Sequence, residues 1–194
     1  MHRPVPRPQQ LLSSVAPRAE LAPLLTPTLA AVVSGARRRA LRDGDRQIDT
    51  AHLLHSLVES DPEVRASLEG DGRLARVLGY LVQRSIGYGL RWQGSVEESA
   101  VRRLLPAARG PEAPHSRNSS CSPAATAALE GAFRRAAERG EPQARGTDLL
   151  AALAVDAESR AVEVLRRAGV DPAVLASRID EAVGLPDGAR SQQV

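Results

Sequence analysis

The strongest constraint on the fold of this chain is an internal duplication at a constant offset of 96 residues. Residues 26–40 align with residues 122–136 without a gap, and leucines at the same offset extend the match to residues 57 and 153. Three pairs of conformationally special residues coincide under this offset: Pro27 with Pro123, Gly35 with Gly131, and Gly44 with Gly140. A fixed offset over such a span indicates two copies of one structural unit.

Each copy begins with the signals of a helix. Thr26 and Ser122 are good N-cap residues, and each precedes a proline at the first helical position, where the missing N–H costs nothing. Apolar residues then recur at helical spacing until a glycine ends each helix. A second helix follows in each copy, and we expect Asp49 or Thr50 to cap the first of these and Thr147 to cap the second.

The remainder of each copy also has helical periodicity, over residues 62–68 and 72–85 in the first and over 159–168 and 171–183 in the second. Aromatic residues, which favour strands, make up only 2% of the chain. Neither unit is large enough to bury much surface alone, so we expect the two to pack together. The predicted fold is all-α: two tandem four-helix repeats packed with pseudo-twofold symmetry.

Composition divides the chain further. The stretch between the copies is rich in Gly, Pro and Ser, which is typical of a linker, and chain ends are usually loose. The expected segments are a flexible N-terminal segment at 1–23, repeat 1 at 24–86, a linker at 87–120, repeat 2 at 121–185 and a flexible tail at 186–194.

The residue inventory argues against an enzyme. All 26 basic residues are Arg, so a phosphate-binding loop of the Walker A type and a Schiff-base lysine are both excluded. The single Cys121 excludes an internal disulfide and a cysteine-based zinc site, and no G-x-S-x-G motif occurs. His52 and His55 have no third ligand at a suitable spacing. We therefore expect no catalytic residues, no metal and no cofactor.

Hydropathy and charge bear on location and partners. The sequence has no run of 18 apolar residues and no secretory signal pattern, so we expect a cytoplasmic protein without a membrane span. The net charge is only +3, with the basic excess concentrated between Arg37 and Arg46. A solvated helix face explains this excess best. The alternative is an anionic partner, which would make the protein a small DNA-binding regulator.

The two copies resemble the N-terminal repeat (Clp-R) domain of the Clp/Hsp100 unfoldases. The first-helix pattern of that family, F-T-P-x-A, stands here as LTPTL at 25–29 and as CSPAA at 121–125. The second-helix pattern, G-T-E-H-L-L-x-x-L, stands as DTAHLLHSL at 49–57 and, one residue shorter, as GTDLLAAL at 146–153. The run at 161–175 is similar to the family pattern A-x-x-V-L-x-x-x-G-V-D-x-x-x-L.

This resemblance implies a non-catalytic protein- or peptide-binding module related to substrate or adaptor recognition in Clp proteolysis. The chain is similar to small actinobacterial homologues that lack an AAA+ ATPase and are thought to act as accessory or decoy proteins. The implied partners are the Clp ATPase and ClpP machinery, its substrates or its adaptors. Phosphoarginine proteins and cyclic-peptide antibiotics are further ligands of the family.

The resemblance also implies candidate site residues. In the family the Thr that begins the first helix and the Glu of G-T-E contribute to a phosphoarginine site, whose phosphate needs N–H or hydroxyl donors and whose guanidinium needs an acid. Ala51 replaces that Glu in the first copy, so at most one site is expected to work. The candidates are Thr26, Thr50, Ser122, Thr147 and Asp148, and the alternative is that the hydroxyls are only helix caps.

Three aromatic residues lie close together in the sequence: Tyr80, Tyr88 and Trp92. Two interpretations of this cluster are open. The rings either pin the linker onto the helices or line a peptide groove, because exposed aromatic residues make good anchors for a partner.

Overall fold

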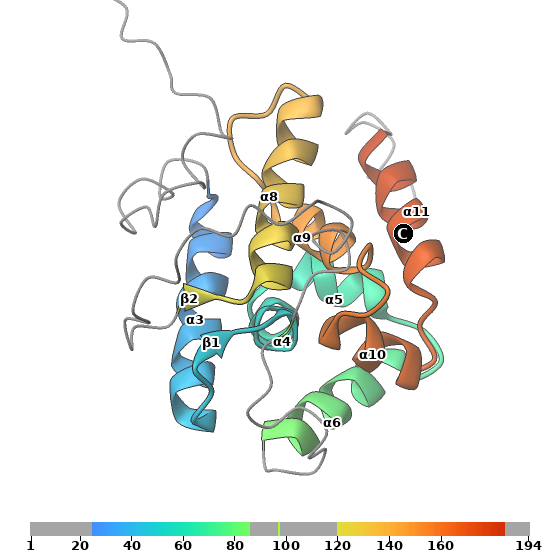
Figure 1. Ribbon diagram of the computed structural model, residues 1–194. Helices are drawn as coiled ribbons and strands as arrows, with labels where there is room; N and C mark the ends of the chain where they lie inside the picture. The colour runs from blue at the N-terminus through green and yellow to red at the C-terminus, as the bar shows by residue number, and fades with distance from the viewer. Residues whose placement is uncertain (1–24, 86–96, 98–119, 185–194) are drawn as a thin grey trace, which may run out of the picture.

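The computed structural model of the chain describes residues 25–85, 97 and 120–184 (Figure 1). These described residues form eight helices and two short strands: α3 (Pro27–Asp43), β1 (Gln47–Ile48), α4 (Thr50–Ser60), α5 (Pro62–Leu68), α6 (Arg73–Ser85), β2 (Ser120–Cys121), α8 (Pro123–Glu138), α9 (Gly146–Leu153), α10 (Arg160–Arg167) and α11 (Pro172–Gly184). The prediction of an all-α fold built from two four-helix repeats is confirmed.

The predicted helix signals act as expected at the first helix of each repeat. The Thr26 hydroxyl accepts a hydrogen bond of 3.2 Å from the Leu29 N–H, and the Ser122 hydroxyl accepts one of 3.1 Å from the Ala125 N–H. At the other end, the two glycines that follow these helices both have φ of +74°, a left-handed conformation that terminates a helix and favours glycine.

The pseudo-twofold relation is visible in two parallel bridges between the repeats. Ile48 in β1 pairs with Cys121 in β2, and Leu25 forms an isolated bridge with Ala144. Adding 96 to Leu25 gives Cys121, and adding 96 to Ile48 gives Ala144. Each repeat therefore offers the same two segments to its neighbour, with the roles exchanged.

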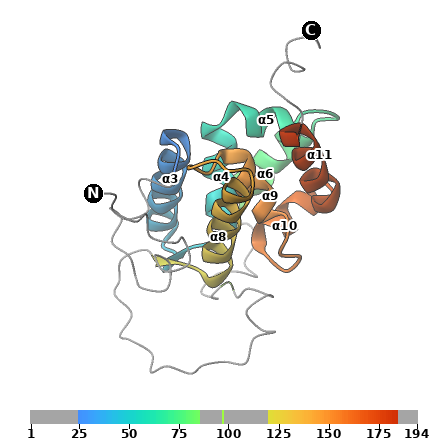
Figure 2. The same cartoon turned by 90° about the horizontal axis from the view of Figure 1, so that it is seen from above.

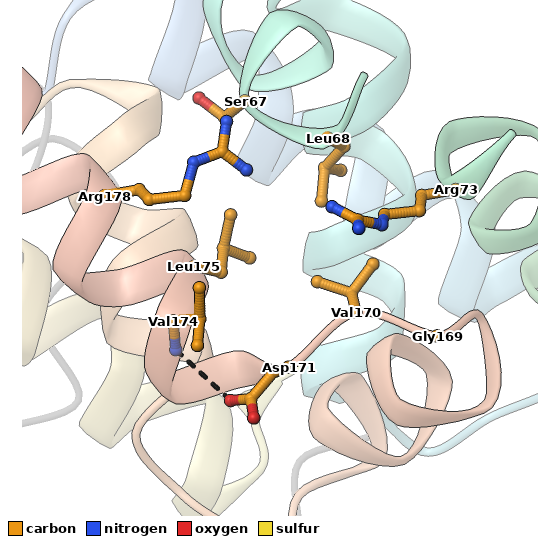
Figure 3. A pocket seen from close by; sticks show the side chains of 9 residues that line it. All are labelled: Ser67, Leu68, Arg73, Gly169, Val170, Asp171, Val174, Leu175 and Arg178. Atoms are coloured by element: carbon orange, nitrogen blue, oxygen red, sulfur yellow. Dashed lines mark hydrogen bonds between the residues drawn. The ribbon is translucent and has the colours of Figure 1, made fainter. Parts of the chain in front are cut away.

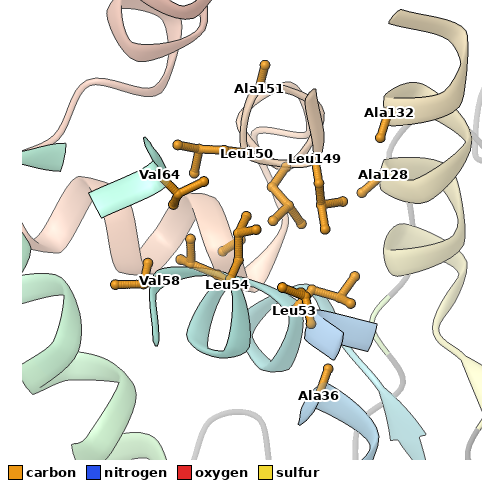
Figure 4. Packing of buried hydrophobic residues seen from close by; sticks show 14 of the residues in the cluster. Ala36, Leu53, Leu54, Val58, Val64, Ala128, Ala132, Leu149, Leu150 and Ala151 are labelled. Carbon is orange, nitrogen blue, oxygen red and sulfur yellow. The ribbon is translucent and has the colours of Figure 1, made fainter. Parts of the chain in front are cut away.

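The core lies between the second helices of the two repeats. Leu53 and Leu54 of α4 face Leu149 and Leu150 of α9, and all four side chains are fully buried (Figure 4). The remaining helices surround this pair, with α3 and α11 on opposite sides of it in both views of the ribbon (Figures 1 and 2). Burial of one such leucine contributes about 2 kcal/mol to the free energy of unfolding. Because the leucines come from both repeats, their contact stabilises both.

Two glycines that coincide in the duplication allow the first and second helices of each repeat to approach closely. A Cβ atom on Gly35 would lie 2.9 Å from the Ser56 hydroxyl oxygen, and one on Gly131 would lie 3.0 Å from the Ala152 Cβ. Residues 56 and 152 also differ by 96, so the same packing contact recurs in both repeats.

The structure corrects the predicted start of the second helix in repeat 2. The helix α9 begins at Gly146 with Arg145 at the N-cap, and Thr147 is not the cap. Asp148 is therefore the third helical residue, as His52 is in α4. The offset of 96 thus holds through this helix. The motif G-T had suggested a one-residue gap because it occurs one position later in repeat 2.

The glycine at the start of α9 provides a test of the packing. A Cβ atom on Gly146 would lie 2.0 Å from the Asp61 Oδ2 atom, which is buried, so Gly146→Ala forces a shift between α9 and α5. We expect a loss of about 2 kcal/mol in the free energy of unfolding, measured by urea denaturation. Gly79→Ala is the matched control, because Gly79 is helical with open space around it, and it is expected to stabilise by about 0.5 kcal/mol. Equal effects of the two variants would contradict the close approach.

Candidate functional site

Three helices from both repeats begin around one buried carboxylate, that of Glu97, which is only 6% exposed. The helices are α4 of repeat 1 and α8 and α10 of repeat 2, and they supply Thr50, Ser122 and Arg160 at their first turns. Since the N-terminus of a helix presents unpaired N–H groups and a partial positive charge, this arrangement favours an anion.

Within the described part of the chain, four donors bind the Glu97 carboxylate. Its Oε2 atom accepts from the Thr50 N–H at 2.8 Å and from the Ser122 hydroxyl at 3.0 Å. Its Oε1 atom accepts from the Arg160 N–H at 2.7 Å and from the Thr50 hydroxyl. We call this set of donors the Glu97 pocket. Two residues that the sequence analysis singled out, Thr50 and Ser122, thus lie together in a site that binds an anion.

A second buried network lies next to the Glu97 pocket, at the N-cap of α4. The Asp49 side chain accepts hydrogen bonds from the His52 N–H at 2.9 Å and from the guanidinium groups of Arg84 and Arg160. Burial alone would raise the pKa of Asp49, but the His52 hydrogen bond and the two arginine charges hold it well below its usual value. Because Arg160 belongs to repeat 2, this cluster joins the repeats.

The same network accounts for the closest approach to a metal-binding set among the described residues. Asp45, Asp49 and His52 each place one potential ligand atom within 4.8 Å of the others. Arg84 pairs with both carboxylates of this set, however, and a fixed guanidinium opposes a cation there. Burial lowers the pKa of His52, but the neighbouring carboxylates of Asp45 and Asp49 raise it above its usual 6.5 overall.

Asp148, the acidic candidate of the sequence analysis, lies outside the Glu97 pocket. Its carboxylate is fully buried and accepts two hydrogen bonds from Arg139, at 2.5 and 2.7 Å, and one of 2.9 Å from the Arg145 N–H. This is a bidentate ion pair within repeat 2. The acid is thus already engaged by a guanidinium of the same chain.

The other candidates are dispersed. Thr26 caps α3, and Thr147 is half-buried in the first turn of α9. Tyr80 packs against the hydrophobic core from α6. Tyr88 and Trp92 lie outside the described residues, so the structure tests neither interpretation of the aromatic cluster.

The basic face of α3 is partly neutralised. Arg39 pairs with Glu59, and Arg42 lies 3.3 Å from the Asp43 carboxylate. Arg38, Arg42 and Arg46 remain exposed. Opposite charges thus interrupt the stripe that had suggested an anionic partner.

A surface pocket of about 290 Å³ runs along α8 and α9 and reaches the start of α10. Small residues of α8, among them Ala124, Ala127 and Gly131, form part of its wall. Thr50 and Ser159 line one part of it, so it adjoins the Glu97 pocket. We call this surface the α8–α9 groove.

A smaller pocket of about 120 Å³ lies where α5, α6 and α11 meet (Figure 3). Its walls include the apolar side chains of Leu68, Val170 and Leu175, and the guanidinium groups of Arg73 and Arg178 point toward it from two sides (Figure 3). The Asp171 carboxylate at its edge accepts from backbone N–H groups at the start of α11. The volume of this pocket limits it to a small group.

Sequence reasoning missed the two groups that organise this region. Arg160 gave no signal, because its partner Asp49 is 111 positions away in the chain. Glu97 lies in the stretch interpreted as a linker, where local composition predicts no buried acid. The position of Asp49 as a cap was the only local indication of a charged cluster at the start of α4.

The ion pair in repeat 2 yields a prediction about stability. Arg139→Met leaves the Asp148 carboxylate buried without its bidentate partner, which is expected to cost about 3 kcal/mol in the free energy of unfolding. Arg145→Ala is the control, because its side chain is 43% exposed and pairs with Glu141 at the surface, so a loss below about 1 kcal/mol is expected. Urea denaturation of both variants measures the difference. A smaller loss in Arg139→Met than in Arg145→Ala would contradict a structural role of Asp148.

His55 on α4 yields a prediction about pH. Burial and the positive charge of Arg39 lower the pKa of His55 from 6.5 to about 4. The unfolded chain therefore binds a proton that the folded chain rejects between these values, so stability is present above pH 6.5 and falls as the pH decreases toward 4. We expect His55→Gln to reduce the loss of unfolding free energy between pH 7 and pH 5 by about 1–2 kcal/mol. Urea denaturation at both pH values measures this, and an unchanged loss would contradict the lowered pKa.

Comparison with known proteins supports the relationship proposed from the motifs. Residues 120–194 match the model of one family, the Clp repeat (R) N-terminal domain. No curated protein matches the chain.

Two solved structures share the fold. One, described as a preliminary structural investigation of a malarial protein secretion system, superposes with a TM-score of 0.56 at 14% identity, covering 81% of this chain and 93% of the other. The second is the N-terminal domain of the caseinolytic protease-associated chaperone ClpD from Arabidopsis thaliana. Its TM-score is 0.53 at 15% identity, with 82% of this chain and 94% of the other covered. Residues 120–194 are thus similar to the Clp repeat (R) N-terminal domain, and the fold of such a domain is shared over both halves of the chain.

Proposed function

We propose that this chain is a non-catalytic protein-interaction module of the Clp system, and that it binds a peptide segment of a Clp-associated protein in the α8–α9 groove. The observation that carries this proposal is the coincidence of the groove with the part of the chain that matches the family. Both α8 and α9 lie within residues 120–194. Through such binding the chain would act as an accessory, adaptor or decoy protein in Clp proteolysis. The proposed location of this activity is the cytoplasm.

The shape and composition of the groove suit an extended peptide. Small residues of α8 allow a backbone to approach the helix, and Val155, which is 70% exposed, offers an apolar contact at the end of α9. Charges of both signs line the rim: Glu130, Arg134, Arg135, Glu138 and Asp156. An apolar contact with a polar rim is the usual anatomy of a recognition surface.

Phosphoarginine is one ligand that the family resemblance suggests. Because Asp148 already pairs with Arg139, a bound guanidinium would need another acid, and the groove offers Glu130 and Glu138. The hydroxyl groups of Ser122 and Thr50 are bound to Glu97 and would have to exchange this partner for a phosphate.

DNA binding by the α3 face is less well supported. DNA-binding proteins neutralise phosphates with Lys and Arg side chains, and here two arginines of the face already pair with acids. We therefore retain protein binding as the proposed function.

The proposal is tested by charge insertion into the groove. We expect Val155→Asp to weaken binding of a purified Clp ATPase, or of an arginine-phosphorylated protein, at least about tenfold in biolayer interferometry, because it buries an unpaired charge. Val82→Asp is the matched control, since Val82 is 49% exposed on α6 and lines neither pocket described above. Equal binding by both variants, or a salt-sensitive complex with DNA in place of protein, would contradict the proposal.

A further inference from the structure

We propose that the Glu97 pocket is a carboxylate-recognition site for an acidic side chain of the bound peptide, with Glu97 as an internal ligand that competes for the same place. This inference rests on the proposed function, because it assigns a chemical class to the segment that enters the α8–α9 groove.

The geometry of the donors matches a planar carboxylate. Two donors converge on each of its oxygen atoms: an N–H and a hydroxyl on Oε2, and an N–H and a hydroxyl on Oε1. A carboxylate offers two equivalent oxygens with about four lone-pair positions, so every donor finds an acceptor.

Backbone N–H groups fix the orientation of the two hydroxyl groups that bind the Glu97 carboxylate. The Thr50 hydroxyl oxygen accepts from the Ala161 N–H at 3.0 Å, and the Ser122 hydroxyl oxygen accepts from the Ala125 N–H at 3.1 Å. With these lone pairs engaged by the backbone, the single proton of each hydroxyl points to the carboxylate. Both residues are 1% exposed, which keeps water from competing for these donors.

The donors to Glu97 are neutral groups, which makes the internal ligand exchangeable. The Arg160 guanidinium donates to Asp49, and the Arg160 backbone N–H donates to Glu97. Helix N-termini and hydroxyls stabilise an anion without fixing it in a buried ion pair, whose disruption would leave an uncompensated charge. A second carboxylate can therefore replace the first with the same number of hydrogen bonds.

The corresponding place in the other half of the molecule is closed. There Asp61, the N-cap of α5, places its carboxylate against Gly146 at the start of α9. In repeat 2 the N-cap of α10 is Ser159, whose side chain is shorter and accepts from Val162 of its own helix. The pocket at α4 thus receives its acid from Glu97, far from these helices in the sequence, and it adjoins the groove, whose lining includes Thr50 and Ser159.

The first test uses acetate as a probe for the emptied pocket. We expect Glu97→Ala to lower the melting temperature of the full chain, and acetate to raise it again relative to chloride at equal ionic strength. The wild type and the control Glu181→Ala, an exposed residue on α11, should not respond to acetate. The double variant Glu97→Ala/Ser122→Ala should lose the response. Absence of an acetate effect, or a response to inorganic phosphate alone, would overturn a carboxylate site.

The second test uses a peptide and does not depend on the stability of the alanine variant. In Glu97→Gln, which keeps the shape of the side chain, we expect a Glu-containing segment of the bound Clp partner to bind at least tenfold tighter than to the wild type. The same peptide with Gln in place of Glu should show no gain. Equal gains for both peptides would overturn the proposed competition.

The outcomes separate this inference from the proposed function. Loss of partner binding in Val155→Asp without any effect of acetate on Glu97→Ala retains the groove and rejects the carboxylate site. An acetate response in Glu97→Ala with unchanged partner binding in Val155→Asp retains the pocket as a carboxylate-binding site. The same result rejects the α8–α9 groove as the docking surface, and with it the proposal that a bound peptide brings its acid to the pocket.

Discussion

The packing of α4 against α9 is the contact on which the rest of the molecule depends. Each second helix packs against the first helix of its own repeat and against the second helix of the other repeat, so its leucines are buried from both sides. Leu53 and Leu54 on one side and Leu149 and Leu150 on the other are fully buried by this contact. Because the repeats are related by a pseudo-twofold axis, burying these leucines also brings the starts of several helices together at the interface.

Clustered helix starts create an electrostatic requirement, because their unpaired N–H groups favour negative charge. The molecule meets it with buried carboxylates: Asp49 caps α4, Asp61 caps α5, Asp148 lies in the first turn of α9, and Glu97 binds between three helices. Arginines balance the charge of some of these acids. The basic residues of the chain, all of them Arg, thus contribute to the structure as well as to solubility. A bidentate guanidinium suits a buried carboxylate better than an ammonium group does.

Local and periodic signals made most of the fold predictable. The N-caps at Thr26 and Ser122 and the close helix contact at Gly35 and Gly131 follow from residue type and from the fixed offset. The start of α9 was mispredicted, because a short motif was given more weight than the offset. The Glu97 pocket could not be predicted, since its donors come from helices that only tertiary packing brings together. These donors lie 25 to 63 residues from Glu97 in the sequence.

The two repeats kept their packing and diverged where a ligand would bind. Glycine and leucine positions that set the distance between helices coincide, whereas Thr50 corresponds to Gly146 and His52 to Asp148. These residue differences change the hydrogen-bond acceptors of the N–H groups at the start of each second helix. In repeat 2 an acid of the helix itself does so and pairs with Arg139. In repeat 1 a histidine takes that position and accepts from the Asp49 N–H, whereas the N–H and hydroxyl of Thr50 donate to the carboxylate of the distant Glu97. One scaffold thus satisfies the starts of its two second helices in different ways, with an acid of the helix itself in repeat 2 and with Glu97 in repeat 1.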